Sequence, residues 1–477
     1  MTTLQHYIAG RFVAPVRDLG RFSVINPATE AQVAEILMGS EDDVDLAVAA
    51  AKQAFPAFSA LSLAARIEYA KKLSVVFTRR YGEMVTAITT EMGAPYTLSH
   101  DSQAECGPGH ITATIEAALA LDWETRSGPK GAVVREAVGV CGMITPWNWP
   151  MNQIAAKVIP ALVAGCTVVL KPSEQSPLSA QLFAEFIDEA GYPPGVFNMV
   201  HGAGPIVGHA IAAHPDVDAV SFTGSTKAGI LVAKAAADTV KRVAQELGGK
   251  SANIIFADAD LEAAVTRGVL HCFNNTGQSC NAPTRMLVEA SVYDQAVAIA
   301  VKVGAKVEVG DPTKPGKQLG PVSSKMQFDK IQGCIKVGIE EGAEVVLGGL
   351  GKPAGLETGY FVKPTIFAGV NNHMTIAREE IFGPVLSIIP FKDEEDAIAI
   401  ANDTPYGLAA YVQSGNLEKA RGVARRLRAG SVYLNGNGQD YCSPFGGYKQ
   451  SGNGREWGKY GLLEYLEFKA INGYYAT

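Results

Sequence analysis

The chain has 477 residues, of which 47% are hydrophobic and 19% charged, and its net charge at pH 7 is −7. This composition excludes a disordered chain, and at about 150 residues per domain the length predicts several domains or one large two-domain enzyme. A mildly acidic chain without a Lys/Arg cluster is not expected to bind nucleic acid or an anionic membrane surface. Fifty of the 477 residues are glycine, a larger share than the roughly 7% of average usage. This surplus predicts many tight turns or close backbone approaches.

The start of the chain lacks the charged-then-apolar plan of a signal peptide. The charge-free stretch Ala137–Ala156 contains prolines and asparagines, which argues against a membrane-spanning helix there. Seven cysteines without a CxxC spacing and eight histidines without an HExxH motif predict neither a disulfide framework nor a metal site. We therefore expect a soluble cytoplasmic protein without a structural metal.

The first 120 residues are predicted to be mostly helical. Ser40 is expected to cap a helix, with Asp43 three residues on and acidic residues at the positive helix end. The segment Leu121–Ala137, with Ser-Gly-Pro-Lys-Gly in its middle, predicts a hairpin. Weak alternation over Tyr465–Tyr474 predicts a strand, and both segments are candidates for an arm that pairs outside its own domain.

Apolar strands alternate with helices from about residue 138. The segments VGVCGMITPW, CTVVLKP, FNMVHG and DAVSFTG predict strands, whereas NQIAAKVIPAL and PLSAQLFAEFIDEAG predict helices. The alternation restarts after Ser251. This pattern is typical of βαβ units, so we predict an α/β fold with parallel sheet in two domains.

Cys280 lies in a small polar loop, Asn-Asn-Thr-Gly-Gln-Ser-Cys-Asn, between a predicted helix and a predicted strand. A nucleophilic thiol there needs thiolate character from nearby dipoles or charges, and the alternative is a buried spectator thiol. Glu246 precedes two glycines at the end of a predicted strand. It could act as a base that activates water to attack a thioester, and the alternative is an ordinary surface residue. The lack of an obvious histidine partner argues against papain-like proteolysis.

Asn148 stands in the sequence Pro-Trp-Asn-Trp-Pro, directly after a predicted strand. A side-chain amide fixed at this point suits an oxyanion, and the loss of one such donor costs about 3–4 kcal/mol of transition-state stabilisation. The alternative is a rigid aromatic turn that only packs.

Several segments suit a dinucleotide, although each has an ordinary turn as its alternative. Lys171 and Glu174 follow a strand, at the edge where α/β proteins bind ligands; Glu174 suits two ribose hydroxyls and would repel a 2′-phosphate, which favours NAD over NADP. The segment Phe222–Ser225 ends a strand and opens a helix, where a phosphate can approach the helix N-terminus. The segment His201–Gly208 departs from G-x-G-x-x-G by one residue.

Seven segments in order, PWNWP, KPSE, FTGST, ELGGK, GQSCNAPTR, EEIFGP and PFGGYKQSG, resemble the NAD(P)-dependent aldehyde dehydrogenase superfamily. The resemblance runs from about Asn26 to the C-terminus. It implies oxidation of an aldehyde to its carboxylic acid with NAD as cofactor and NADP as the less favoured alternative. Cys280 would form a thiohemiacetal and then a thioester, the Asn148 amide and the Cys280 N–H would hold the oxyanion, and Glu246 would activate water. Glu456 would support the proton relay, and Lys157 matches a basic position to which we assign no role.

The resemblance also implies the residues around the reacting groups. Cofactor-binding positions would be Ile144, Thr145, Pro146, Trp147, Lys171, Ser173, Glu174, Gly204, Gly208, Phe222, Thr223, Gly224, Ser225, Leu247, Gly248, Glu380 and Phe382. Lys171 and Glu174 would hold the adenosine ribose, Ser225 the pyrophosphate and Glu380 the nicotinamide ribose. Substrate positions would be Trp149, Gln153, Ser279, Asn281 and Tyr441, a set polar enough to predict a small or moderately polar aldehyde.

The family fold implies two Rossmann-like α/β domains and a β oligomerisation arm. Residues 1–120 and 138–248 would form the NAD-binding domain, residues 249–445 the catalytic domain, and residues 121–137 and 463–477 the arm. Family members are dimers or tetramers because the arm adds a strand to a partner's sheet, so we expect a homo-oligomer.

Three other functions are compatible with parts of the sequence. A CoA-acylating semialdehyde dehydrogenase would release the thioester to CoA, which does not need the Glu246 base. A cysteine thioesterase or hydrolase would lack a use for the cofactor segments. A non-catalytic protein with this fold would not need Cys280, Glu246 and Asn148 together.

Overall fold

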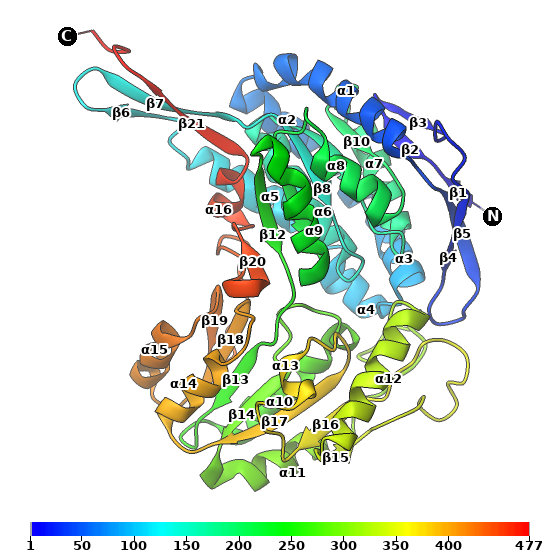
Figure 1. The fold of residues 1–477 in the computed structure, drawn as a ribbon, viewed down its shortest axis with the longest axis vertical. Coiled ribbons are helices and arrows are strands. Elements are labelled where there is room, and N and C mark those ends of the chain that lie inside the picture. Colours follow the sequence, from blue (N-terminus) through cyan, green and yellow to red (C-terminus); the bar gives the residue numbers. More distant parts are fainter. Residues whose placement is uncertain (1, 477) are drawn as a thin grey trace.

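The computed structural model describes residues 2–476, so Met1 and Thr477, the outer ends of the predicted first domain and arm, lie outside the described residues. Figure 1 shows two lobes, one above the other, with a narrow arm extending from the upper lobe. Each lobe is built on one large sheet. No helix among residues 2–476 is long and apolar enough to cross a membrane.

The upper lobe contains an eight-stranded sheet. Its order is β20 (Gly452–Asn453), β12 (Arg242–Glu246), β11 (Ala219–Thr223), β8 (Val140–Ile144), β9 (Thr167–Lys171), β10 (Phe197–Met199), β2 (His6–Ile8) and β3 (Arg11–Val13). The five strands from β12 to β10 are parallel, and the chain leaves β8 toward β9 but returns to its other side at β11. This reversal of strand order is the topological switch point at which open α/β sheets bind ligands.

Helices cover both faces of this sheet. They are α1 (Glu41–Ser59), α2 (Leu63–Arg79), α3 (Tyr81–Met92), α4 (Tyr96–Leu98), α5 (Cys106–Leu119), α6 (Pro150–Ala164), α7 (Pro177–Glu189), α8 (His209–Ala213), α9 (Thr226–Ala236) and α16 (Gly458–Leu463). Side chains alternate along β8, with Cys141 and Met143 in one core and Val140 and Ile144 in the other. Burial on both faces explains why these strands are continuously apolar.

The lower lobe contains a seven-stranded sheet. Its order is β15 (Glu344–Leu347), β16 (Thr365–Ala368), β17 (Val385–Phe391), β14 (Arg285–Glu289), β13 (Ala252–Ile255), β18 (Ala409–Gln413) and β19 (Ser431–Leu434), and all neighbours except β15 and β16 are parallel. Its helices are α10 (Leu261–Phe273), α11 (Tyr293–Gly304), α12 (Lys325–Glu340), α13 (Thr375–Arg378), α14 (Glu394–Asn402) and α15 (Leu417–Arg426). The predicted α/β class with two parallel-sheet domains is confirmed.

The predicted hairpin and C-terminal strand are also confirmed. Strands β6 (Glu124–Ser127) and β7 (Gly131–Ala137) pair antiparallel, and β21 (Leu466–Ile471) pairs with the other edge of β7. These three strands form the arm in Figure 1. The residues just before β21 belong with the upper lobe, because β20 pairs with β12 and α16 packs on α5 and α6.

The prediction that the first 120 residues are mostly helical is wrong for their first third. Strands β1 (Thr2–Leu4), β5 (Gln32–Leu37) and β4 (Arg21–Ile25) form a small sheet, and β2 and β3 extend the eight-stranded one. These strands have three to six residues, too few for alternation to stand out, so their pairing with one another, and of β2 with β10, decides their conformation. The helix predicted after Ser40 is present, and Asp43 Oδ2 accepts from the Ser40 backbone N–H at 2.8 Å.

Candidate active site

A cavity of about 180 Å³ lies between the two lobes, where the carboxyl ends of β8, β11 and β12 face the segment that precedes β14. The chain itself crosses there, since β12 ends at Glu246 and β13 begins at Ala252. The residues lining the cavity are Pro146, Trp147, Asn148, Gln153, Thr223, Gly224, Ser225, Glu246, Leu247, Gly248, Cys280, Gln327, Lys330, Glu380 and Phe382. All of these except Gln327 and Lys330 are among the predicted site residues.

The Cys280 loop follows α10 through a short irregular turn. Asn275 and Thr276 both adopt left-handed backbone conformations, with φ of 53° and 55°, which cost on the order of 1–3 kcal/mol each for residues other than glycine. Gly277 packs so tightly that an added Cβ would lie 2.1 Å from the Gly383 carbonyl. Strain of this size persists only where the surrounding structure dictates the backbone conformation, and the close packing at Gly277 does so here.

Side chains from the upper lobe hold this loop. Asn148 Nδ2 donates to the Gln278 carbonyl at 3.0 Å, and Asn275 Nδ2 donates to the Asn148 carbonyl at 2.9 Å. Trp149 Nε1 donates to Ser279 Oγ at 2.8 Å. The turn after β8 and the Cys280 loop are therefore bound to each other by side-chain hydrogen bonds across the gap between the lobes.

A buried acid–base chain lies behind the cavity. Lys157 Nζ donates to Thr223 Oγ1 at 2.6 Å and forms an ion pair with Glu456 Oε1, and the Lys157 side chain is fully buried. Burial, followed by the negative charge of Glu456, raises the pKa of Glu246 well above its ordinary range, while Lys157 and Arg455 oppose the rise. Glu246 Oε2 is buried and has no hydrogen-bond partner within residues 2–476. Glu246 is therefore poised to gain or lose a proton.

Cys280 is half-buried, and it is the one cysteine among the residues that line the cavity. Burial, followed by the carboxylates of Glu380 and Glu246, raises the pKa of the Cys280 thiol, while the backbone N–H groups of Cys280 and Asn281 lower it. The raised pKa favours the protonated form of the thiol. Its activation requires a nearby base that takes the proton.

Glu380 and Phe382 form the lower wall of the cavity. Glu380 Oε1 accepts from the Gly249 N–H at 2.9 Å, so this carboxylate is attached to the crossing segment. Phe382, with φ of 61°, meets Trp147 edge to face at a centroid distance of 5.5 Å. Gln327 Nε2 donates to the Phe382 carbonyl at 2.8 Å and so supports the strained turn.

A second group of predicted residues lies at the carboxyl ends of β9 and β10. Lys171 Nζ lies 2.7 Å from Glu174 Oε2, and Glu174 Oε1 accepts from the Gly204 N–H at 3.2 Å. Ser173 Oγ accepts from the Gln175 N–H. The remaining members are Ile144 and Thr145 at the end of β8, Phe222 in β11, and Gly208 at the end of the short turn that begins at Gly204. Ser225 caps α9 through its hydroxyl.

Three predicted residues have other surroundings. Ser279 bonds to Trp149, as described, and the Asn281 carbonyl accepts from the Tyr411 hydroxyl at 2.9 Å. Tyr441 lies outside the cavity lining and packs on His110 and Trp457, with centroid distances of 4.8 and 5.3 Å.

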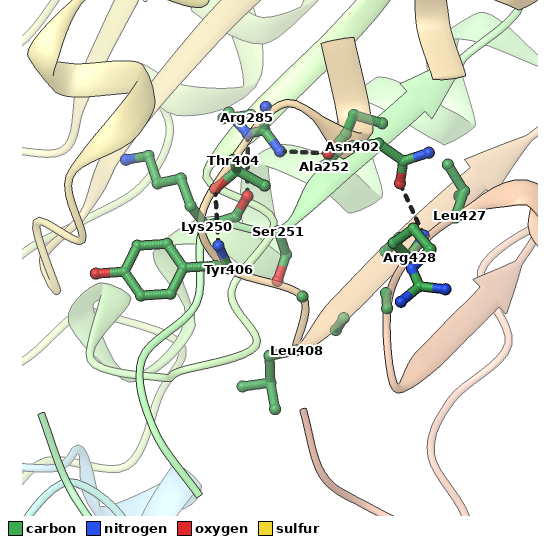
Figure 2. Close-up of a pocket in the computed structure, with 15 residues that line it drawn as sticks. Lys250, Ser251, Ala252, Arg285, Asn402, Thr404, Tyr406, Leu408, Leu427 and Arg428 are labelled. Atoms are coloured by element: carbon green, nitrogen blue, oxygen red, sulfur yellow. Dashed lines mark hydrogen bonds between the residues drawn. The ribbon is translucent and has the colours of Figure 1, made fainter. Parts of the chain in front are cut away.

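Arg285, the last residue of the GQSCNAPTR segment, fixes the chain just beyond the cavity. Its side chain is almost fully buried and donates to the Lys250 carbonyl at 3.0 Å (Figure 2). It also donates to the Ala401 carbonyl at 2.9 Å. The space beside it measures about 20 Å³, which is room for about one water molecule. The hydrogen bonds of Arg285 therefore hold the backbone here, and the cavity beside it is too small to hold a substrate.

Sequence reasoning did not single out Gln327, Lys330 or Asn275. The first two lie on α12 and meet the cavity only through the fold, without a local motif. Asn275 stood in the quoted Cys280 loop without a role, and its identity was a usable signal because asparagine tolerates left-handed backbone better than most residues. Among the described residues, no group of three or more His, Cys, Asp or Glu side chains could hold a metal ion.

Comparisons with known proteins identify the family. The sequence profile of the Aldehyde dehydrogenase family matches residues 14–471. A relative from Pseudomonas sp. named 3-succinoylsemialdehyde-pyridine dehydrogenase is 56% identical over 471 residues, covering 98% of each chain. A mutant of aldehyde dehydrogenase C from Pseudomonas syringae, solved with NAD+ and octanal, has a TM-score of 0.98 and 49% identity and covers 100% of this chain and 98% of its own. Betaine aldehyde dehydrogenase from Staphylococcus aureus, solved with NAD+, has a TM-score of 0.95 and 34% identity and covers 99% and 95%.

These matches span nearly the whole chain. The chain therefore belongs to the aldehyde dehydrogenase family, whose members oxidise aldehydes to carboxylic acids.

Proposed function

We propose that this protein oxidises an aldehyde to its carboxylic acid with NAD+ as hydride acceptor and Cys280 as nucleophile. The observation that carries the proposal is that Cys280, Asn148 and Glu246 line one cavity together with the carboxyl ends of β8, β11 and β12. Nucleophile, oxyanion donor and base thus meet at the edge where a parallel sheet binds a dinucleotide.

The residues at this edge fit a dinucleotide. Glu174 presents a carboxylate beside the Gly204 N–H, an added Cβ on Gly204 would meet nothing within 4 Å, and Ser225 is exposed at the N-terminus of the eleven-residue helix α9. Lys171 and Glu174 would bind the adenosine ribose, Ser225 the pyrophosphate and Glu380 the other ribose. The negative charge of Glu174 disfavours a 2′-phosphate, so NAD+ is preferred to NADP+. When bound, NAD+ supplies the hydride acceptor.

Cys280 opens the reaction. The ionised carboxylate of Glu246, which its raised pKa makes a stronger base, takes the thiol proton, and the thiolate attacks the aldehyde carbon to form a C–S bond. The carbonyl oxygen becomes an oxyanion that the Cys280 N–H and Asn148 Nδ2 stabilise. One N–H of the Asn148 amide is held by the Gln278 carbonyl, which orients the other toward the cavity.

Glu246 closes the reaction. Once the thiohemiacetal carbon has lost its hydride, a thioester remains on Cys280. Glu246 then releases to solvent the proton that it took from the thiol, and the ionised carboxylate takes a proton from water as the water oxygen attacks the thioester carbon. Collapse of the adduct releases the acid and returns the sulfur to Cys280. Glu456 would then receive the proton from Glu246 and pass it on, while the buried Lys157 ammonium group, which pairs with Glu456, would hold that carboxylate in place.

The alternatives use these residues less completely. A CoA-acylating enzyme has no need for a buried, unpartnered carboxylate beside the thiol, and a cysteine hydrolase has none for the dinucleotide edge. We propose a small or moderately polar aldehyde as substrate. The Pseudomonas relative is named for a pyridine semialdehyde and the Pseudomonas syringae structure contains octanal, so chain length and ring content are the variables to test.

We further propose a cytoplasmic homo-oligomer, a dimer or tetramer, joined through the arm. The three arm strands extend from the upper lobe in Figure 1, and Phe468 on β21 is 57% exposed. Uncovered strand edges are normally protected in folded proteins, and pairing with a second copy would protect them.

A panel of aldehydes followed by NADH absorbance, with NAD+ and with NADP+, tests the function. We expect NADH formation without added CoA and a higher kcat/KM with NAD+. Strict dependence on CoA would favour the acylating reaction, and the absence of cofactor reduction with every aldehyde would refute the proposal.

A further inference from the structure

One fully buried glutamine of the upper lobe donates a hydrogen bond to the Cys280 loop of the lower lobe. Gln103 is the last residue of a single turn of π-helix, Ser99–Gln103, which lies between α4 and α5. Its Nε2 donates to Asn275 Oδ1 at 3.0 Å, and its side chain is fully buried. Turns of π-helix are rare and occur frequently at functional sites, and the reaction described above gives Gln103 no role.

The surroundings of Gln103 are unfavourable for an amide in every other respect. Its Oε1 is enclosed and accepts no hydrogen bond within residues 2–476. Its Nε2 also lies 3.5 Å from Met92 Sδ, which is a weak acceptor. An enclosed oxygen without a partner destabilises the folded protein, so an apolar side chain of similar length would suit the position better. The bond to Asn275 is therefore the contact that an amide is needed for.

Asn275 passes the constraint to two residues beside the reacting thiol. Its Oδ1 accepts from Gln103, and its Nδ2 donates to the Asn148 carbonyl at 2.9 Å and to the Gln278 carbonyl at 3.2 Å. Both ends of this amide are thereby occupied, and a rotation that exchanged oxygen and nitrogen would bring Oδ1 against two carbonyls. Asn148 is the proposed oxyanion donor, and Gln278 lies two residues before Cys280.

The strained part of the loop is held from both lobes. Thr276 Oγ1 donates to the Gly320 carbonyl of the lower lobe at 3.0 Å, whereas Asn275 is bonded to Gln103 and Asn148 of the upper lobe. Left-handed backbone at residues other than glycine persists only where the surrounding structure holds it. Loss of the bond from Gln103 should therefore let the loop shift relative to the upper lobe.

We propose that Gln103 is a positioning residue, which through Asn275 fixes the Cys280 loop against Asn148 so that nucleophile and oxyanion donor keep the arrangement that the first chemical step needs. Gln103 is not among the residues that line the cavity, so it acts through Asn275 and not on the substrate. The inference rests on the proposed function for the rate that it controls.

Gln103→Met removes the donor together with the unpaired oxygen and keeps the length of the side chain. With pentanal as the aldehyde, the single-turnover rate of NADH formation is expected to fall about tenfold, the factor that one buried hydrogen bond supplies. The KM for NAD+ should stay within about twofold, because the sheet-borne residues do not move. The Tm should fall by no more than about 2 °C, because the loss of the enclosed oxygen offsets the loss of the bond.

Hydrogen exchange provides a readout that needs no aldehyde. Backbone amides of residues 274–281 should exchange several-fold faster in Gln103→Met than in the wild type, because the loop has lost a bond to the upper lobe. Exchange elsewhere in the lower lobe should be unchanged.

Ser99→Ala is the matched control. Ser99 is fully buried on the same turn of π-helix, accepts from Thr89 Oγ1 at 2.9 Å and donates to the Ala94 carbonyl at 3.2 Å, so its hydrogen bonds stay within the upper lobe. This variant is expected to lower the Tm and to keep the single-turnover rate and the exchange of residues 274–281 within about twofold of the wild type.

A double-mutant cycle tests the route through Asn275. In the Asn275→Ala background the acceptor is already gone, so Gln103→Met should lower the rate less than twofold further. A full additional tenfold loss would show that Gln103 acts by another path and would overturn the inference.

The remaining outcomes are distinguishable. If the wild type forms no NADH with any aldehyde of the panel, the proposed function fails, and hydrogen exchange alone decides whether Gln103 holds the loop. A rate in Gln103→Met within twofold of the wild type, or an equal loss in Ser99→Ala, overturns the inference and leaves the proposed function standing. If Gln103→Met does not fold, Gln103→Leu is measured against the same limits. Failure of both to fold would assign Gln103 to folding and would also overturn the inference.

Discussion

The two sides of the cavity are positioned by different kinds of interaction. The side that we propose binds the dinucleotide consists of turns at the carboxyl ends of β8, β9 and β11, held by the regular hydrogen bonds of the eight-stranded sheet. The Cys280 side is a strained turn before β14, held by single side-chain bonds that cross between the lobes. A single substitution on the sheet-borne side should therefore change the selectivity for the cofactor and leave turnover largely intact. A single substitution on the Cys280 side should lower the rate of turnover.

The largest effect is expected for Cys280→Ser. Loss of the sulfur removes the covalent step, so turnover should fall by on the order of 10⁴-fold or more, while NAD+ binding to the sheet-borne side persists. NADH absorbance and titration of NAD+ by protein fluorescence measure the two quantities. Cys442→Ser, which changes an exposed thiol, is the control and should retain activity. If Cys280→Ser lost NAD+ affinity as strongly as it lost turnover, the two sides of the cavity would not act independently.

Glu246→Gln should reduce steady-state turnover by about 10²–10⁴-fold, the usual contribution of a general base. Hydrolysis should slow more than the first hydride transfer, so a burst of NADH should precede the slow phase. Because burial and Glu456 raise the pKa of Glu246, the wild-type rate should rise as pH increases through that raised pKa, and the variant should lack this limb. An unchanged steady-state rate with an intact burst would contradict the assigned role.

Asn148→Ala should lower kcat by about 10²–10³-fold, because one oxyanion donor is lost. The substitution also removes the bond to the Gln278 carbonyl, so some loss arises from loosening of the Cys280 loop. Stopped-flow measurement of the NADH burst tests the first step directly. A normal burst rate would exclude Asn148 from oxyanion stabilisation.

Asn275→Ala sharpens the comparison, because Asn275 supports the loop without lining the cavity. It loses the bond to the Asn148 carbonyl and places alanine at a φ of 53°, so kcat should fall about tenfold with little change in the KM for NAD+. The exposed neighbour provides the control, since Asn274→Ala removes no such bond and should behave as wild type. Loss of NAD+ affinity equal to the loss of kcat would indicate general unfolding.

The smallest effect is expected for Glu174→Gln on the sheet-borne side. Removal of the negative charge should raise kcat/KM with NADP+ several-fold relative to NAD+ and leave the NAD+-dependent kcat within about threefold. Steady-state kinetics with both cofactors measures the ratio. A ratio that does not move would show that Glu174 does not set cofactor preference.

The parallel-sheet elements were predictable because buried strands are continuously apolar and the connecting helices begin and end with clear signals. The strands before residue 38 were not predictable, because segments of three to six residues carry too little alternation and are stabilised by their pairing in the folded sheets. Most of the cavity lining coincides with the motif residues, since those motifs stand at strand ends. Gln327 and Lys330 could not be found in this way, because a helix remote in sequence brings them to the cavity.

The sequence by itself determined the α/β class, the chemical groups of the site and the family resemblance, because strand periodicity and short motifs are local properties of the chain. Only the tertiary structure decided the distances and charges among those groups: the burial that raises the pKa of Glu246, the pairing of Lys157 with Glu456, and the bond from Gln103 to Asn275. The physical reason is that burial and electrostatic coupling depend on segments far apart in sequence that meet only when both lobes are folded.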